Sequence, residues 1–371
     1  MKISDDFLHA IPKTDLHVHL DGSLRVETLM ALAEERSVPL PADDPEKLKK
    51  VLNIGGIHEN LEAYLRVFDT TLKVMQDEEA LCRIAYELAE DASKENCRYI
   101  EVRYSPILHQ RLGLPMPVII ESVAEGLRQA KRQFGIMSGQ IVCGIRHMTP
   151  QTSLRLAELA VAFKHKGVVA FDLAGAEWNN PAEDHAEAFQ LVRKNNVNST
   201  VHAGEAYGPR SIHQAIHDCN AHRIGHGTRL REDGDLLNYL NDHRIPLEVC
   251  LKSNVQTRAV HSIEEHPLRS YMEYGLRVTL NTDNRLVTDT SCTEEFSLAV
   301  NTFDLTFDDV RRLVLDGFKS AFMPFRKKRE IMRKALQEFD EVAVAHGLTS
   351  TLPTQGLSRY AIDKDGEHLP D

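Results

Sequence analysis

The stretch DLHVHL, residues 15–20, alternates two histidines with apolar residues, and seven further short runs rich in apolar residues follow it along the chain. These runs are YIEVRY (99–104), IVCGIRH (141–147), VVAFDLAG (168–175), STVHAGE (199–205), RIGHG (223–227), PLEVC (246–250) and LRVTLNTD (276–283). Most of them are apolar for several residues and then end in a polar or charged group. This pattern is typical of a fully buried parallel strand with chemistry at its carboxyl end.

Longer segments between these runs repeat apolar residues at helical spacing. They are SLRVETLMALAEERS (23–37), DEEALCRIAYELAEDASKE (77–95), MPVIIESVAEGLRQAKRQFG (116–135) and SLRLAELAVAFKHKG (153–167). Acidic residues near the start of each segment suit the positive end of a helix dipole. Strands that alternate with helices predict an α/β fold, either a TIM-type (β/α)₈ barrel or a doubly wound sheet.

The first and second predicted strands are unusually far apart in the sequence. Residues 24–75 hold at least two helices and the loop PLPADDPEK, so we predict an insertion after the first strand, over about 24–95. Loops that follow barrel strands border the active site, so this insertion is interpreted as a lid over the barrel mouth; the alternative is a packing appendage without a role in the reaction. Two or three extra helices are expected within 292–346, followed by a loosely held polar tail at about 348–371. We expect residues 1–371 to form one domain.

Composition and charge narrow the class of protein. The formal net charge is -11 and no basic stripe is present, which argues against nucleic acid and anionic membranes as partners. The N-terminus lacks the pattern of a signal peptide, and no stretch approaches the about 18 apolar residues of a membrane span. The 6 cysteines are scattered without a CxxC pair, as expected for reduced thiols. A cytoplasmic protein that acts on a small molecule is therefore expected.

Four residues at predicted strand ends form a candidate metal site. His17 and His19 are two positions apart, so alternation in a strand directs both imidazoles toward the barrel axis. His202 begins the last four residues of the run at 199–205, and Asp283 ends the run at 276–283. Nitrogen and oxygen ligands without a thiolate suit zinc and leave a position for water. The joint pattern predicts a site for one Zn²⁺ ion.

Other polar residues follow the same strand ends. His226 lies between two glycines and is a candidate acceptor for a proton from water, or else a hydrogen-bonded core histidine. Glu205 is a candidate fourth ligand, general acid or structural partner. Asp21 is a candidate acceptor for a substrate hydroxyl group, or a turn residue, and Gly175 allows a planar ligand to approach the backbone.

Six segments, in this order and spacing, resemble the adenosine deaminase family of the metal-dependent amidohydrolase superfamily. They are HVHLDGS (17–23), DLAGAE (172–177), HAGEA (202–206), RIGHG (223–227), SNVQT (253–257) and LNTD (280–283). The resemblance extends from about Thr14 to about Phe325. It implies a zinc-bearing (β/α)₈ barrel that hydrolyses adenosine, and by extension 2′-deoxyadenosine, to inosine and ammonia in purine salvage.

The resemblance also implies roles for individual residues. The implied zinc ligands are His17, His19, His202 and Asp283. Asp283 would also orient the attacking water and help to deprotonate it, with His226 as base or electrostatic partner. Zinc lowers the pKa of water from 15.7 toward about 7, which supplies the nucleophile that attacks purine C6. Glu205 would donate a proton to purine N1.

Substrate contacts implied by the family involve four positions, one of which departs from the common pattern. Asp21 and His19 would contact the ribose, and the backbone of Gly175 would contact purine N3. The family usually carries a second Asp after the ligand Asp, whereas this chain has Asn284. That residue would face purine N7, which only accepts hydrogen bonds. An amide donates there at any pH, whereas a carboxyl group must first be protonated.

Three alternatives remain open from the sequence. The first is deamination of another 6-aminopurine, such as aminodeoxyfutalosine, a 5′-thio-adenosine or adenine; AMP is disfavoured because its phosphate would meet Asp21. The second is an amidohydrolase that cleaves a phosphoester or amide with two metals and a bridging lysine at the fourth strand, but DLAG contains no lysine. The third is an inactive barrel that binds metal without turnover.

Overall fold

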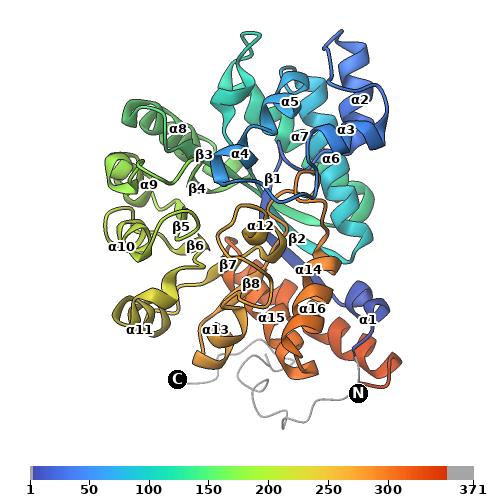
Figure 1. Ribbon diagram of the computed structural model, residues 1–371, viewed down its shortest axis with the longest axis vertical. Coiled ribbons are helices and arrows are strands. Elements are labelled where there is room, and N and C mark those ends of the chain that lie inside the picture. The colour runs from blue at the N-terminus through green and yellow to red at the C-terminus, as the bar shows by residue number, and fades with distance from the viewer. Residues whose placement is uncertain (1–2, 349–371) are drawn as a thin grey trace.

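Residues 3–348 are described by the structure, a computed structural model, and within them eight strands form one sheet (Figure 1). The strands are β1 (Lys13–His19), β2 (Cys97–Tyr104), β3 (Met137–Ile145), β4 (Val168–Ala174), β5 (Asn198–Ala203), β6 (Arg223–His226), β7 (Leu247–Val249) and β8 (Val278–Leu280). Consecutive strands pair in parallel. A parallel bridge between Val18 and Asp283 joins β1 to the segment after β8. The sheet thus closes into the predicted (β/α)₈ barrel, and the doubly wound alternative is excluded.

The strand ends determine where the polar residues of the motifs lie. β5 ends at Ala203 and β8 ends at Leu280, so Glu205 and Asp283 lie in loops just beyond the strands. β3 begins at Met137, before the apolar run at 141, because its polar first residues pair with β2 through the backbone. Backbone pairing does not depend on side-chain polarity, so apolar runs locate the buried part of a strand better than its exposed start.

Helices surround the barrel, and the four predicted from spacing are confirmed. They are α2 (Val26–Glu35), α6 (Glu78–Lys94), α7 (Met116–Phe134) and α8 (Pro150–Ala162). Asp77 caps α6 by accepting from the Ala80 N–H at 2.9 Å, and Gly135 ends α7 at φ 75°. The other barrel-side helices are α9 (Ala186–Lys194), α10 (Pro209–His217), α11 (Gly234–Asp242), α12 (Leu251–Gln256) and α13 (Leu268–Tyr274), with the 3₁₀ turns η2 (Pro106–His109), η3 (Lys164–Lys166), η4 (Ala182–His185) and η5 (Leu230–Glu232).

The segment between β1 and β2 contains the predicted insertion. It folds as α2, α3 (Pro45–Val51), α4 (Leu61–Leu65), α5 (Phe68–Thr71) and η1 (Leu72–Val74) before α6 begins. Its loops lie against the segments that follow β7 and β8, since Gly55 N–H donates to Val287 O at 3.0 Å and His58 N–H donates to Gln256 O at 2.9 Å. The insertion therefore borders the barrel mouth. By contrast, α6 packs with α7 and β2 in one apolar cluster as a helix of the barrel wall.

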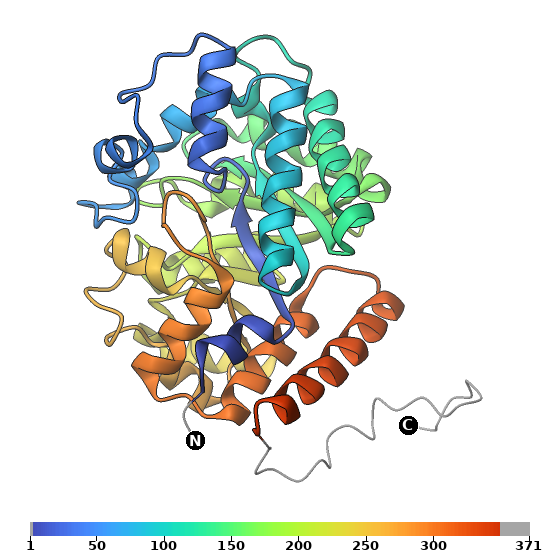
Figure 2. The same cartoon turned by 90° about the vertical axis from the view of Figure 1, so that its right-hand side faces the viewer.

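The opposite end of the barrel is covered by terminal helices, as Figure 2 shows for α1 (Asp5–Ala10) and α16 (Phe325–Ala345). α14 (Cys292–Phe303) and α15 (Phe307–Ser320) precede α16, so the expected helices of 292–346 are present. Phe7 of α1 and Phe339 of α16 pack edge to face with ring centroids 5.7 Å apart. Nearly all of the predicted tail, residues 349–371, lies outside the described residues.

The barrel interior is charged rather than apolar. Arg103 bridges Asp172 and Glu248 at 2.9 Å each, and Arg223 bridges Glu248 and Glu101 at 2.5 Å each. All five side chains are at most 1% exposed. Burial of a charge is costly unless it is paired and hydrogen-bonded, and here each carboxylate contacts a guanidinium. This ionic layer lies directly beneath the residues of the candidate site.

Two further features concern membrane spans and cysteines. Among residues 3–348, no helix combines the length and the apolar character needed to cross a membrane. The cysteines are all free, and five of them are buried.

Candidate active site at the strand ends

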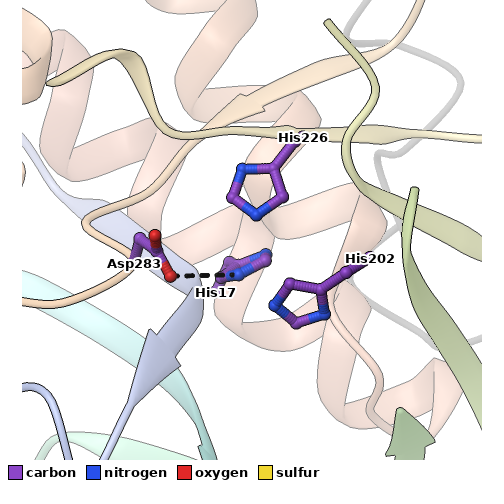
Figure 3. Close-up of side chains that lie close together, drawn as sticks. All are labelled: His17, His202, His226 and Asp283. Atoms are coloured by element: carbon purple, nitrogen blue, oxygen red, sulfur yellow. Dashed lines mark ion pairs between the residues drawn. The ribbon is translucent and has the colours of Figure 1, made fainter. Parts of the chain in front are cut away.

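Four ligand-type side chains converge at the carboxyl ends of the strands (Figure 3). His17 comes from β1, His202 from β5, His226 from β6 and Asp283 from the loop after β8. One ligand atom of each lies within 4.8 Å of the corresponding atoms of the others, and all four residues are buried. His17 Nε2 and Asp283 Oδ1 are 3.4 Å apart. Residues from distant parts of the chain meet here because parallel strands end at the same rim of the barrel.

The fourth predicted ligand, His19, adjoins this cluster. Its Nε2 is 3.4 Å from Asp283 Oδ1 and 3.1 Å from His202 Nε2. The structure therefore brings together all four residues predicted as zinc ligands, and it adds His226 to them. The set of four whose ligand atoms all lie within 4.8 Å of one another contains His226 in place of His19. Ligand assignment thus depends on which of these two imidazoles directs a lone pair into the cluster.

The chemistry of the donor atoms suits a divalent cation. His17 Nε2 is buried without a hydrogen-bond partner, which is costly unless a ligand occupies its lone pair. Burial lowers the pKa of His19 and of His202, so both imidazoles are neutral at pH 7. Burial alone would raise the pKa of Asp283, but the close contact with His17 and the adjacent imidazoles lower it well below its usual range. Neutral imidazoles around an ionised carboxylate form a typical zinc ligand set.

The far nitrogens of two of these histidines contact buried carboxylates. His17 Nδ1 lies 2.8 Å from Glu248 Oε2, and His202 Nδ1 lies 3.2 Å from Asp172 Oδ1. Such carboxylates fix the tautomer with the proton on Nδ1 and direct the lone pair of Nε2 toward the site. Arg103 binds both carboxylates and so connects the two histidines through one guanidinium.

Asp283 and His226 lie in unusual backbone conformations. Their φ angles are 59° and 63°, in the left-handed region that is costly for residues other than glycine. Asp283 is held there by backbone hydrogen bonds on both sides, from Asp283 N–H to His17 O at 2.8 Å and from His19 N–H to Asp283 O at 2.7 Å. Ser253 Oγ donates to Asp283 Oδ2 at 2.6 Å, which leaves Oδ1 facing the histidines.

Glu205 lies beside the cluster as a buried carboxyl group. Its Oε1 accepts from Thr257 Oγ1 at 3.0 Å, and its Oε2 is 3.5 Å from His226 Nε2. Burial raises the pKa of Glu205 well above its ordinary value, and the negative charges of Asp283 and Glu177 raise it further. A carboxyl group that remains protonated at neutral pH can act as a general acid.

Glu177 fixes the turn that carries Glu205. Its carboxylate accepts from four consecutive backbone N–H groups, those of residues 204–207, at 2.5–3.0 Å. Gly204 within this turn has φ 71°, and a Cβ there would lie 2.5 Å from Ile212 Cδ1, so only glycine fits. The turn therefore places the Glu205 side chain over the barrel axis with little freedom.

The residues predicted to contact substrate line the same mouth. Asp21 is 5% exposed and its Oδ1 has no partner; burial, and to a smaller extent Asp283, raises its pKa to about 7. Gly175 has φ 97°, and a Cβ there would lie 3.4 Å from His147 Nδ1. Asn284 Oδ1 is also buried without a partner. Unsatisfied acceptors at the mouth are consistent with groups that await a ligand.

One mouth residue was not predicted. Tyr64, from α4 of the insertion, is 2% exposed, and its hydroxyl accepts from Asn284 Nδ2 at 2.8 Å and contacts Thr288 Oγ1 at 2.7 Å. The insertion thus reaches the candidate substrate site through the Tyr64 side chain. Nothing in the local pattern around Tyr64 marks this contact, since its partners are more than 200 positions away in the sequence.

Comparison with known proteins shows the family of the chain. The sequence model of the adenosine deaminase family matches residues 12–338. The adenosine deaminase of Clostridium kluyveri is 40% identical over 332 residues, covering 90% of this chain and 94% of the relative. The adenosine deaminase of Mycobacterium ulcerans is 41% identical over 349 residues, covering 90% and 96%. The chain belongs to the adenosine deaminase family. The predicted family membership is therefore confirmed.

Other members of the adenosine deaminase family and its structural neighbours differ in length and substrate. A probable adenosine deaminase of Dictyostelium discoideum is 38% identical over 91% of this chain, which spans only 44% of that relative. Among solved structures, an adenine deaminase of Arthrobacter aurescens has a TM-score of 0.83 at 26% identity, covering 90% of this chain and 99% of the other. An N6-methyl-AMP deaminase of Arabidopsis has a TM-score of 0.80 at 28% identity, covering 91% and 99%.

Proposed function

We propose that the protein is a hydrolytic deaminase that converts adenosine, and also 2′-deoxyadenosine, to inosine and ammonia in purine salvage. The observation that carries the proposal is the meeting of three histidines and Asp283 around an unpartnered His17 Nε2, with the buried carboxyl group of Glu205 beside them. The adenosine deaminases among its relatives support the same reaction. The acidic charge balance, with a net charge of -11, supports a small-molecule substrate, and the free cysteines support a cytoplasmic location.

The donor set fits one zinc ion. His17, His19, His202 and Asp283 would hold it through nitrogen and oxygen atoms. Zinc, when bound, lowers the pKa of water from 15.7 toward about 7 and so supplies a nucleophile at neutral pH.

The protein's own residues supply the proton transfers. Asp283 Oδ1, ionised and turned toward the histidines, orients the attacking water and accepts its proton. Burial and neighbouring negative charge raise the pKa of Glu205, which favours its protonated form, and it delivers that proton to purine N1. Transfer to N1 makes C6 more electrophilic and stabilises the charge that develops on the ring as the water adds. The proton taken up by Asp283 then passes to the 6-amino group, the C6–N bond breaks to release ammonia, and the proton of the added hydroxyl group returns to Glu205. The surrounding side chains are buried, which excludes competing solvent.

Substrate orientation follows from the unsatisfied groups at the mouth. Asp21 accepts from a ribose hydroxyl group, assisted by His19, while the backbone at Gly175 contacts purine N3. Asn284 Nδ2 carries two hydrogens, of which one is donated to the Tyr64 hydroxyl group and the other is donated to purine N7. A buried carboxyl group at Asp21 accommodates a hydroxyl group far better than a phosphate, so the nucleoside is preferred to AMP.

A second candidate is another 6-aminopurine. The solved structure of an adenine deaminase, similar to this chain over 90% of its length, favours adenine as the first of these. Aminodeoxyfutalosine and 5′-thio-adenosines would keep the same purine contacts and alter only the group near Asp21. The ribose contacts at Asp21 and His19 are superfluous for adenine, and we therefore place adenosine first.

The proposal is tested by following ultraviolet absorbance with the zinc-loaded protein on adenosine, 2′-deoxyadenosine, adenine, AMP and 5′-modified adenosines, with Glu205→Gln in parallel. We expect conversion of adenosine to inosine, with kcat reduced by about 10²-fold or more in Glu205→Gln. Preference for adenine or a modified nucleoside would retain the chemistry and replace the substrate. Absence of turnover on every 6-aminopurine, with zinc bound, would refute the deaminase proposal.

A further inference from the structure

A row of three buried side chains leads from the start of α13 to the candidate active site. His266 Nε2 lies 3.2 Å from Asn254 Oδ1, and Asn254 Nδ2 lies 2.9 Å from His226 Nδ1. All three residues are at most 4% exposed. Because water does not reach them, the protons along this row are determined by the partners of each atom.

The outer end of the row has an unambiguous donor. The backbone N–H of Leu268 donates to His266 Nδ1 at 3.1 Å, so that nitrogen must be the acceptor. Burial lowers the pKa of His266 to about 3, so the ring is neutral and its single proton lies on Nε2. His266 Nε2–H therefore donates to Asn254, and the atom of Asn254 that faces it must be the carbonyl oxygen.

The orientation of Asn254 then determines the proton on His226. With Oδ1 turned to His266, the amide group Nδ2 faces His226 and donates to Nδ1. Asn254 is 0% exposed, and its backbone is held by hydrogen bonds from Asn254 N–H to Cys250 O and from Val260 N–H to Asn254 O, at 3.0 Å each. An inverted amide would place two donors, Asn254 Nδ2–H and His266 Nε2–H, against each other, so the orientation with Oδ1 toward His266 is the one that satisfies both groups. The single proton of neutral His226 is consequently on Nε2.

We infer that His266 and Asn254 are positioning residues that make His226 a hydrogen-bond donor, neither metal ligand nor general base, in the proposed deamination. A nitrogen that carries a proton has no lone pair for a metal ion and accepts no second proton. The metal ligand set is then His17, His19, His202 and Asp283, and the acceptor of the water proton is Asp283. His226 Nε2, which lies 3.5 Å from Glu205 Oε2, stabilises negative charge as it develops on the attacking oxygen.

The geometry around His226 supports this role. Its φ of 63° and the φ of 69° at Gly227 turn the chain sharply after β6, so the ring is fixed over the barrel axis. Gly225 leaves room on the other side, since a Cβ there would lie 3.0 Å from His17 Cε1. A donor held rigidly in place costs no reorganisation in the transition state, which is the condition under which such a donor is most effective.

The assignment is tested first by long-range ¹H–¹⁵N correlation spectra of the ¹⁵N-histidine-labelled full-length protein, with and without zinc. Two buried histidines are internal references: His109 Nδ1 faces Met75 O at 2.9 Å and must carry its proton there, whereas His185 Nε2 faces Arg146 O at 3.1 Å. The signals of His226, identified by their loss in His226→Gln, are expected to match the His185 pattern in both states. A match to the His109 pattern, or loss of the Nε2 proton when zinc binds, would overturn the assignment.

Variants of the row test its effect on the reaction. Asn254→Asp presents an acceptor to Nδ1, so we expect the His226 proton to move to Nδ1 and kcat on adenosine to fall about 10²-fold, with KM changed less than about threefold. His266→Gln retains one acceptor and one donor, so the His226 spectrum and kcat are expected to be preserved. His266→Phe removes the acceptor and the donor, so the tautomer signal of His226 is expected to broaden. A shifted tautomer with an unchanged kcat would refute the donor role.

The deaminase proposal and the proton assignment of His226 can be refuted separately. If the wild-type protein does not deaminate adenosine but His226 shows the Nε2–H pattern, the proposed substrate is wrong and the proton assignment stands. If adenosine is deaminated while Asn254→Asp and His266→Phe leave both spectrum and kcat unchanged, the positioning role is wrong and the deaminase proposal stands.

Discussion

Replacement of Arg103 by methionine is expected to weaken both the fold and the metal site. Arg103 is fully buried, and its guanidinium donates to Asp172 Oδ2 at 2.9 Å, to Glu248 Oε2 at 2.9 Å and to Leu16 O at 2.6 Å. Methionine has a similar length but no charge. Glu248 would still contact Arg223 at 2.5 Å, whereas Asp172 would lose the guanidinium that compensates its charge.

The magnitude follows from burial. Removal of one partner from a buried ion pair typically costs about 3–5 kcal/mol, because the other charge is left uncompensated in a poorly solvating interior. That is a large part of the about 5–15 kcal/mol by which native domains are stable. The same two carboxylates orient His17 and His202, and loss of such support typically lowers metal affinity about 10- to 100-fold.

The assay is urea unfolding of the metal-free protein together with zinc competition against a chromophoric chelator. Arg25→Met is the matched control, since Arg25 also binds two carboxylates, Glu90 and Asp91, but is 31% exposed. Exposed pairs contribute only about 0–1 kcal/mol, so the control should change little. If Arg103→Met unfolds within about 1 kcal/mol of the wild type and binds zinc equally well, the reasoning about the ionic layer is wrong.

Three further outcomes are expected. Tyr64→Phe should lower kcat/KM for adenosine about fivefold, because the Tyr64 hydroxyl group orients Asn284. The kcat/KM for 7-deazaadenosine, which lacks the N7 acceptor, should be unchanged, and equal losses on both nucleosides would contradict this. Burial raises the pKa of Glu295 to about 8, so the folded protein keeps a proton on Glu295 that the unfolded protein releases. The free energy of unfolding should therefore fall as pH rises from about 4.5 to about 8. Urea titrations of Glu295→Gln should show a smaller dependence on pH, and an identical dependence would contradict this prediction. Dialysis against a chelator should abolish deamination and added zinc should restore it, whereas full activity at less than a tenth of stoichiometric zinc would argue against a metal role.

The strand and helix pattern predicted an α/β fold, the family resemblance implied the barrel, and the candidate ligands could be predicted for a simple physical reason. Alternation brings His17 and His19 to one face of a strand, and parallel strands bring their carboxyl ends to one rim, so residues such as His202 and Asp283 must meet. Neither argument requires knowledge of the packing between distant segments. The same holds for the helices, whose apolar spacing is a local property.

Supporting residues escaped prediction because their contacts depend on three-dimensional packing. Charged residues in buried strands, such as Arg103 in YIEVRY and Glu248 in PLEVC, signal an ionic interior, yet the sequence does not say which of them pair across the barrel. Tyr64 reaches the mouth from a helix without a distinctive pattern. Asn254 lies in the motif SNVQT, but its partner His266 follows in an irregular loop, so the relay is visible only in the folded protein.

Among the described residues, twelve residues other than glycine adopt left-handed backbone conformations, and two of them belong to the candidate active site. His226 and Asp283 both adopt left-handed backbone conformations, which for such residues cost about 1 kcal/mol or more each. Glycine occupies the neighbouring sharp turns at positions 204 and 227, where no functional side chain is needed. A glycine at 226 or 283 would relieve the strain but would remove the donor or the carboxylate from the barrel axis. The surrounding hydrogen bonds, from Asn254 to His226 and from Ser253 to Asp283, therefore stabilise a conformation that neither residue would adopt alone.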